Sequence, residues 1–263
     1  VDSAGQVTGV AYAKGDYSVA IGQGSQALGI GAFAIGLADT AKGDYSLAMG
    51  YKTRASNKYS TAFGEGTTAS GDFSTAFGEW TTASGSGSTA FGRYTTSSDW
   101  SSTAFGYGTT ASGRSSTAFG YYTKASNYAS TAFGYQTTAS GLFSTASGRQ
   151  TTASGHSSTA FGSETTASGA YSTALGYNTT AQAYESLVLG RFNIISGTPS
   201  NWIDSDPIFV IGNGTSDSDR KNALTVLKNG RLGLQSVTSP TYALELPDNS
   251  DSGIGQARAY AWA

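Results

Sequence analysis

A five-residue motif that returns at a fixed interval constrains this chain more than any other feature. Ser60-Thr-Ala-Phe-Gly64 begins again at residues 74, 88, 102, 116, 130 and 158, always a multiple of 14 residues further on. Looser copies in the same register extend the series from Ser18 to Ser186, which is twelve steps of 14 without insertion or deletion. A short fixed period is the signature of stacked repeats. The chain is therefore expected to form a solenoid.

Each 14-residue repeat is too short to contain a helix, so we expect two short strands per coil. We number the repeat from the serine of Ser-Thr-Ala-Phe-Gly as position 1. Positions 1 to 5 and 8 to 12 predict the strands, since strands of about five residues are common. Sequence variation gathers at positions 6, 7, 13 and 14, the predicted turns. The predicted fold class is all-β, a parallel β-roll of 14-residue coils over residues 1–190.

Glycine recurs at positions 5 and 12 of the repeat. Position 5 is Gly in every copy from Gly22 to Gly190, and position 12 is usually Gly, with Asn57 and Asp99 among the replacements. Gly, Asn and Asp best tolerate a left-handed backbone. We therefore expect a left-handed conformation at position 12, and either a turn or a close backbone approach at position 5.

Alternation along the first predicted strand separates small residues from large apolar ones. Position 3 is Ala in every copy except Val188, and position 10 is Ala in every copy except Ser97, so a thin interior is expected. Position 4 lies on the opposite face and is large and apolar in every copy except Ser147. The position 4 residues expected to face a partner chain are Ile21, Ile35, Met49, Phe63, Phe77, Phe91, Phe105, Phe119, Phe133 and Phe161.

This apolar column predicts self-association. Neighbouring strands lie about 4.8 Å apart, so some thirteen coils would carry a stripe roughly 60 Å long. Soluble monomers rarely expose so much contiguous apolar surface, and burying half of one Phe contributes about 1 kcal/mol. One stripe per chain, shared around an axis, indicates a closed cyclic oligomer. In the alternative interpretation, Phe fills a wide monomeric coil and Ala must face solvent in every turn.

The repeat resembles a known family. Ser18-Val-Ala-Ile-Gly22, followed by Ser25, Ala27 and Gly29, resembles the head repeat of YadA-like trimeric autotransporter adhesins, and the likeness covers roughly residues 4–190. The resemblance implies a left-handed roll and a parallel homotrimer. It also implies an extracellular fibre anchored at a bacterial outer membrane, which attaches to a host, prey or matrix receptor, possibly a glycan. The chain departs from the family in its middle copies, with Thr at position 2 and Phe at position 4.

The period ends after Gly190, and residues 191–263 are assigned to a small β-rich connector unit. Residues 223–227 and 231–234 predict a hairpin around Asn229-Gly230, which suits a tight primed turn, and strands are also expected at 207–212 and 242–246. Residues 206–234 and 257–263 resemble the segment before an endosialidase-type intramolecular chaperone in bacterial surface fibres and phage tail fibres. The alternative function is therefore a receptor-binding tail fibre of a phage or contractile injection system, located on a virion tail.

Aromatic residues gather in the predicted turns and are the candidates for ligand contact. Exposed aromatic side chains on a rigid stack can bind sugars or protein. In the alternative interpretation, these rings pack on one another from turn to turn and stiffen the stack. The candidate ligand-binding residues are Trp80, Tyr94, Trp100, Tyr107, Tyr121, Tyr122 and Tyr135.

Composition argues against several other classes of function. Only 12% of residues are charged and the net charge is -2, which disfavours a nucleic-acid surface. The sequence contains no run of 18 apolar residues, so no membrane-spanning helix is predicted. With no Cys and only His156, we expect no zinc site, no Ser-His-Asp triad and no cofactor. Glu65 and Glu79 raise the alternative of a glycosidase pair, but Arg93 follows them at position 6, so a solvated charge ladder and a non-enzymatic protein are predicted.

Overall fold

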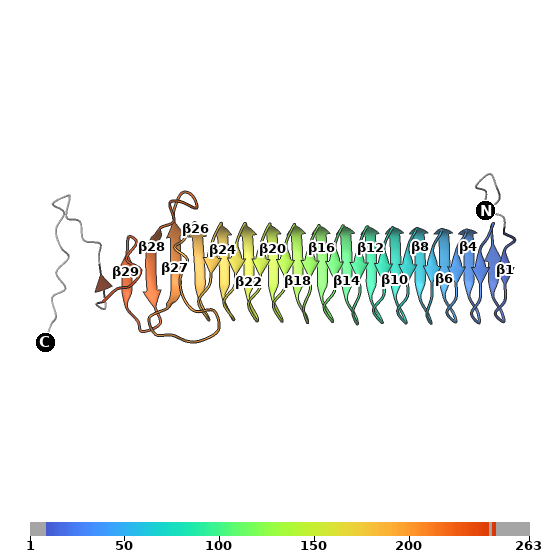
Figure 1. The fold of residues 1–263 in the computed structure, drawn as a ribbon, viewed down its shortest axis with the longest axis horizontal. Helices are drawn as coiled ribbons and strands as arrows, with labels where there is room; N and C mark the ends of the chain where they lie inside the picture. Colours follow the sequence, from blue (N-terminus) through green and yellow to red (C-terminus); the bar gives the residue numbers. More distant parts are fainter. Residues whose placement is uncertain (1–8, 242–243, 246–263) are drawn as a thin grey trace. The chain divides into compact units, whose positions relative to one another are not determined.

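The computed structural model describes residues 9–241 and 244–245. The chain forms two compact units, residues 1–143 and 144–263, which we take one at a time. Among the described residues, all regular secondary structure is β-strand and none is helix (Figure 1). No segment of this part of the chain is therefore a helix able to cross a membrane.

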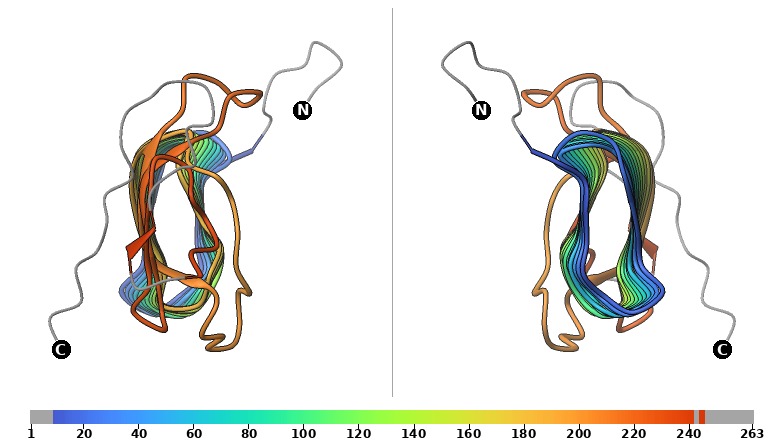
Figure 2. Two further views of the ribbon diagram at one scale, coloured as in Figure 1. Left: turned by 90° about the vertical axis from the view of Figure 1, so that its left-hand side faces the viewer. Right: turned by 90° about the vertical axis from the view of Figure 1, so that its right-hand side faces the viewer.

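Each coil of the first unit is a flattened loop, with a long strand on one side and a short strand on the other (Figure 2). Strands of one kind stack in parallel and in register, so that Phe77 pairs with Phe91 and Thr68 pairs with Thr82. The long strands are β2 (Val19–Ile21), β4 (Phe33–Leu37), β6 (Leu47–Tyr51), β8 (Thr61–Glu65), β10 (Thr75–Glu79), β12 (Thr89–Arg93), β14 (Thr103–Tyr107), β16 (Thr117–Tyr121) and β18 (Thr131–Tyr135). The short strands are β1 (Tyr12–Ala13), β3 (Gln26–Ala27), β5 (Thr40–Ala41), β7 (Arg54–Ala55), β9 (Thr68–Ala69), β11 (Thr82–Ala83), β13 (Thr96–Ser97), β15 (Thr110–Ala111), β17 (Lys124–Ala125) and β19 (Thr138–Ala139).

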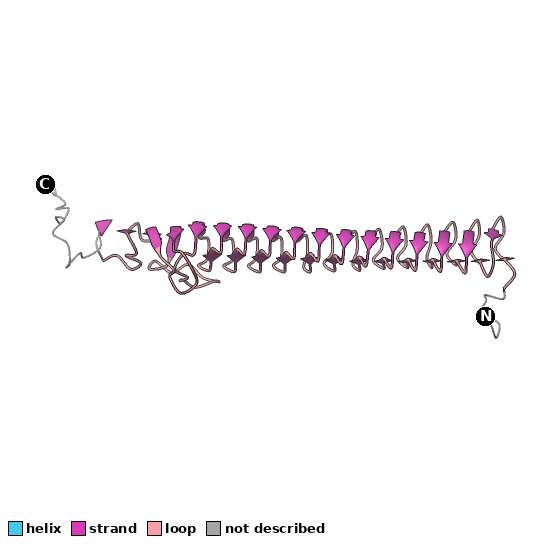
Figure 3. Ribbon diagram, turned by 90° about the horizontal axis from the view of Figure 1, so that it is seen from above, coloured by secondary structure: helices cyan, strands magenta, loops and turns pink. Residues whose placement is uncertain are grey.

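The second unit begins with coils of the same kind, and within it the long and short strands again form separate rows (Figure 3). Its long strands are β20 (Thr145–Arg149), β22 (Thr159–Ser163), β24 (Thr173–Tyr177) and β26 (Leu187–Arg191). Its short strands are β21 (Thr152–Ala153), β23 (Thr166–Ala167) and β25 (Thr180–Ala181). The prediction of an all-β parallel solenoid with a 14-residue period is confirmed.

The chain after β26 changes from a roll to a meander. Strand β27 (Pro207–Asn213) pairs in parallel with β26, β28 (Asn222–Leu227) is antiparallel to β27, and β29 (Leu232–Leu234) is antiparallel to β28. The predicted hairpin is confirmed, and Gly230 in its turn has φ 83°. Of the strand predicted at 242–246, the structure describes β30 (Leu244–Glu245), parallel to β29. Residues 257–263 lie outside the described part of the chain.

The interior of each coil is built from small side chains, as predicted. Ser60, Ala62 and Ala69, at positions 1, 3 and 10, have no exposed surface. The Ser60 hydroxyl donates a hydrogen bond of 2.6 Å to the carbonyl oxygen of Asn57, which holds the turn against the strand. Thr67, at position 8, is equally buried, but its hydroxyl oxygen has no hydrogen-bond partner among the described residues. The interior is thus thin, with an unpaired threonine hydroxyl in most coils.

The two glycine positions have different physical causes. Gly64, at position 5, has φ 122°, and a Cβ there would lie 1.9 Å from the carbonyl oxygen of Gly78. Gly71, at position 12, lies outside the left-handed region, but a Cβ there would lie 2.1 Å from the carbonyl oxygen of Gly85. The prediction of a left-handed backbone at position 12 was therefore wrong. Positions 7 and 14 adopt that conformation instead, often with bulky residues such as Trp80 at φ 53°.

The strands also differ in extent from their prediction. The long strand covers positions 2 to 6, and the short strand covers only positions 9 and 10. The second strand is short because the chain already bends at position 12, where the carbonyl oxygen of Gly71 accepts the Ser74 backbone N–H at 3.2 Å. This carbonyl oxygen therefore forms a hydrogen bond within the turn rather than in the ladder of short strands.

Candidate functional site

The apolar column at position 4 lies on the outer face of the long strands. The exposed fraction of its Phe side chains runs from 36% at Phe63 to 57% at Phe161, while Ile35 and Met49 are half-buried. From Phe63 to Phe133, successive rings stack with centroids 4.7 to 5.1 Å apart and planes within 7° of parallel. We call these residues, with Ile21, Ile35, Met49 and Phe161, the position 4 column.

One chain by itself cannot bury the position 4 column. Each ring covers the faces of its neighbours, but in the described part of the chain the rings remain partly exposed. The interior offers no alternative, because Ala62 and Ala69 already close it. Exposed apolar surface of this extent favours contact with another apolar surface. The geometry therefore agrees with the predicted self-association, while the trimer interface itself stays a prediction.

Five of the seven candidate ligand-binding residues form one cluster, at the ends of the long strands and in the turn that follows them. Tyr107, Tyr121 and Tyr135 stack with centroids 5.1 and 5.3 Å apart, and Tyr94 and Tyr122 meet them edge-on. We call these five residues the tyrosine cluster. The hydrogen bond between the phenol groups of Tyr122 and Tyr107 raises the pKa of Tyr122 above its ordinary value.

The middle ring of the tyrosine cluster, Tyr121, offers its edge and hydroxyl rather than its faces. In the parallel stack, each ring covers the face of the next, so a sugar cannot lie flat on Tyr121. The two tryptophans lie outside this cluster. Trp80 lies over Gly66, where a Cβ would be 2.8 Å from the indole, and Trp100 has the Arg114 guanidinium 4.4 Å above its ring centre. The five tyrosines thus pack on one another, whereas the two tryptophans contact a glycine and a guanidinium group.

One of the two acidic residues at position 6 has a basic partner in the next coil. Glu79 makes an ion pair of 2.9 Å with Arg93, whose guanidinium also lies 5.0 Å from the ring centre of Tyr94. The predicted charge ladder is confirmed for this pair. Among the described residues, no group of His, Cys, Asp and Glu is arranged to hold a metal ion.

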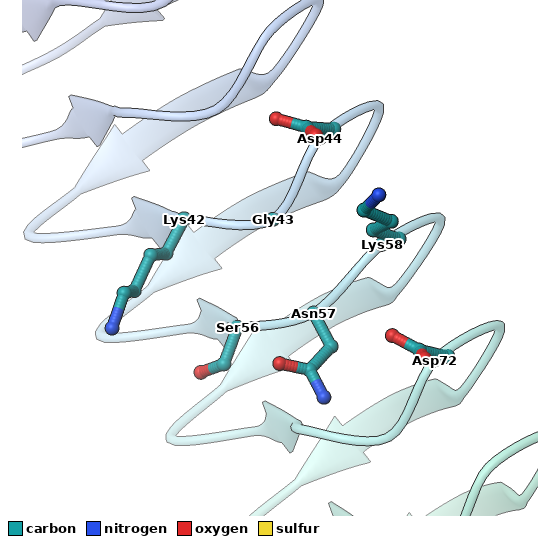
Figure 4. Close-up of a pocket in the computed structure, with 7 residues that line it drawn as sticks. All are labelled: Lys42, Gly43, Asp44, Ser56, Asn57, Lys58 and Asp72. Carbon is teal, nitrogen blue, oxygen red and sulfur yellow. The ribbon is translucent and has the colours of Figure 1, made fainter.

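Sequence reasoning missed a hollow on the opposite turn of the first unit. We call this hollow the turn groove (Figure 4). It has a volume of about 410 Å³ and is lined by Lys42, Gly43, Asp44, Ser56, Asn57, Lys58 and Asp72. Asp44, Lys58 and Asp72 occupy position 13 of three successive coils, while Lys42 extends away from them. Within the described chain, none of these four charged groups forms an ion pair. The alternation of Asp44, Lys58 and Asp72 at position 13 was the signal in the sequence that identifies the turn groove.

A short aromatic ladder borders the turn groove. Tyr45, Tyr59 and Phe73, at position 14, each follow one of the charged residues at position 13. Their rings stack in parallel with centroids 5.3 and 5.0 Å apart. Tyr45 covers Gly31 of the preceding coil, so the rings lean towards the N-terminal side. At the other end of the ladder, position 14 of the next coil is Gly87, and no side chain there covers the far face of Phe73.

Comparison with known families accounts for most of the coils. The model of the YadA head domain repeat (2 copies) matches residues 13–37, 41–67, 69–95, 101–123, 125–151 and 153–179. These six segments include more than half of the chain and follow its 14-residue period. No curated protein matches the chain.

Proposed function

Because the chain belongs to the YadA head repeat family, we propose that it is a non-enzymatic segment of a homotrimeric fibre that attaches to a surface outside the cell. Membership of this family suggests a surface-exposed, adhesin-like head. The trimer, the left-handed winding and the attachment are our proposals for this chain. The receptor is a component of a host, prey or matrix surface.

The exposed position 4 column is the observation that carries this proposal. A solenoid with an interior of Ala, Ser and Thr gains little from burying its own side chains, whereas each half-buried Phe contributes about 1 kcal/mol on association. Three chains around an axis would bring three such columns together. Charged and aromatic turn residues would remain on the outside, where a receptor can reach them.

We place the two parts of the chain in different roles. Residues 1–190 act as the head, and residues 191–263 connect it to the rest of the fibre, with the β27–β29 meander as the lead-in to a chaperone-type domain. The fibre is held at the surface of a bacterial cell. These assignments rest on the resemblance of residues 206–234 to fibre segments of this kind.

Attachment by a trimer predicts a strong dependence on valency, because three linked sites bind together far more tightly than one. The chain is labelled and its binding to intact cells and to immobilised matrix is measured, alongside a variant with Phe105→Glu and Phe119→Glu. Wild type should bind at least tenfold more tightly than the variant. Equal binding by the two would contradict a trimeric adhesin, and so would the absence of binding to any cell or matrix surface tested.

A further inference from the structure

The strongest unassigned feature of the molecule is the turn groove together with the ladder of Tyr45, Tyr59 and Phe73. The turn groove is an open hollow of about 410 Å³, so a ligand there would lie along the turns rather than be enclosed. The groove is formed by backbone turns that repeat every 14 residues, and hydrogen bonds between the turns of successive coils hold them in place. Tyr59 N–H, for example, donates to the carbonyl oxygen of Asp44 at 2.9 Å.

The polar groups of the groove suit an uncharged ligand with many hydroxyls. Asp44 and Asp72 accept hydrogen bonds, Lys58 between them donates, and Asn57 can do both. Two Lys and two Asp line the groove, so their formal charges cancel. A polyanion would meet the two carboxylates, and a polycation would meet the two ammonium groups. A neutral sugar can use groups of both signs at once.

Phe73 supplies the apolar contact that sugar recognition also needs. It is 63% exposed, and its only ring contact in the described structure is with Tyr59, on the N-terminal side. The opposite face looks towards Gly87, and a Cβ built there would meet only the Ser101 hydroxyl oxygen, at 3.5 Å. The C–H edges of a pyranose can therefore pack on this face, where the π-system carries partial negative charge.

We propose that the turn groove and the open face of Phe73 form a binding site for an uncharged oligosaccharide. One sugar ring packs on Phe73, and the following rings lie along the turns, where Asp72, Lys58 and Asn57 bond their hydroxyls. Successive coils are about 4.8 Å apart, so each sugar ring meets the turn of roughly one coil. The ligand of the proposed adhesin is thus an uncharged oligosaccharide, and this inference rests on the adhesin role proposed above.

The chain offers a variant that blocks the site without disturbing the fold. Gly87→Tyr places an aromatic ring at position 14, where Tyr59 is already accommodated with φ 57° and Gly87 itself has φ 65°. The new ring would extend the ladder and cover the face of Phe73. Ser115→Tyr is the matched control, since it adds the same ring at position 14 two coils further on, where φ is 55°.

The test is an array of uncharged hexose and N-acetylhexosamine oligosaccharides, with sulfated and sialylated ones beside them. The best uncharged binder is then titrated by calorimetry into wild type and variants. Gly87→Tyr, Phe73→Ala and Asp72→Ala should each weaken binding at least tenfold. Ser115→Tyr, Tyr128→Ala and Lys124→Ala should leave it within twofold of wild type.

Three outcomes would overturn the site. These are unchanged affinity in Gly87→Tyr and Asp72→Ala, binding only to sulfated or sialylated glycans, and no binding to any oligosaccharide. If the trimer attaches to cells but shows one of these outcomes, the site fails and the adhesin role stands. If the chain neither forms trimers nor attaches to cells, the proposed function fails as well.

Discussion

The inner and outer faces of the long strands use side chains of opposite size. On β14, Ala104 has no exposed surface, while its neighbour Phe105 is 39% exposed. Most globular domains place Phe in the core and tolerate Ala anywhere. Here the small residue closes the chain's own interior, and the large one remains outside. The coil is therefore stabilised by its backbone hydrogen bonds and by close packing of small residues, while the Phe side chains are available for contacts with another chain.

The largest expected effect comes from enlarging the inner face. Ala104→Leu puts three more carbon atoms into an interior only wide enough for Ala, so unfolding should become easier by about 3 kcal/mol or more, or the chain should fail to fold. Thermal unfolding followed by circular dichroism measures this. Phe105→Leu, one residue away on the outer face, is the control and should cost less than half as much. Equal costs would mean that the two faces are not different environments.

The next effect comes from charging the outer face. Phe105→Glu together with Phe119→Glu brings charges into the predicted interface, where desolvation costs several kcal/mol. The variant should sediment as a monomer and keep its β-type circular dichroism. Thr96→Glu with Thr110→Glu places the same charges on the outer face of the short strands and should leave the assembly intact. If the second pair dissociates the assembly and the first does not, the interface lies on the other side of the coil.

Ser147 provides a smaller test in the opposite direction, because it is the one polar residue at position 4 of the repeat. Ser147→Phe should stabilise the assembly by about 1 kcal/mol per chain if the column is buried between chains. The melting temperature should therefore rise. An unchanged or lower melting temperature would count against burial of the column at this coil.

The smallest expected effect concerns the interior hydroxyls. Thr109 Oγ1 is buried without a hydrogen-bond partner in the part of the chain that the structure describes, and Thr109→Val replaces it with a methyl group of similar size. Removing an unsatisfied hydroxyl should stabilise the fold by about 1 kcal/mol or less. Urea unfolding can resolve this change. A loss of 1 kcal/mol or more would show that the hydroxyl makes a hydrogen bond in solution.

Sequence periodicity predicted the coil and its two faces because alternation along a strand follows directly from strand geometry. The prediction from periodicity was wrong at position 12. Glycine there can indicate either a left-handed backbone or the close approach of another segment of the chain, and the sequence is the same in both cases. Only the structure separates them, as Gly71 shows by facing the carbonyl oxygen of Gly85. The turn groove was missed for a related reason. Its groups come from three coils, and the open face of Phe73 depends on the absence of a side chain at Gly87.

Sedimentation equilibrium of the chain at micromolar concentration tests the central claim most directly. A trimer would give a single species with three times the chain mass of 26.8 kDa. The same mass should persist in high salt, since the predicted interface is apolar rather than ionic. A monomer mass at that concentration would contradict the claim that the outer Phe side chains are an assembly surface.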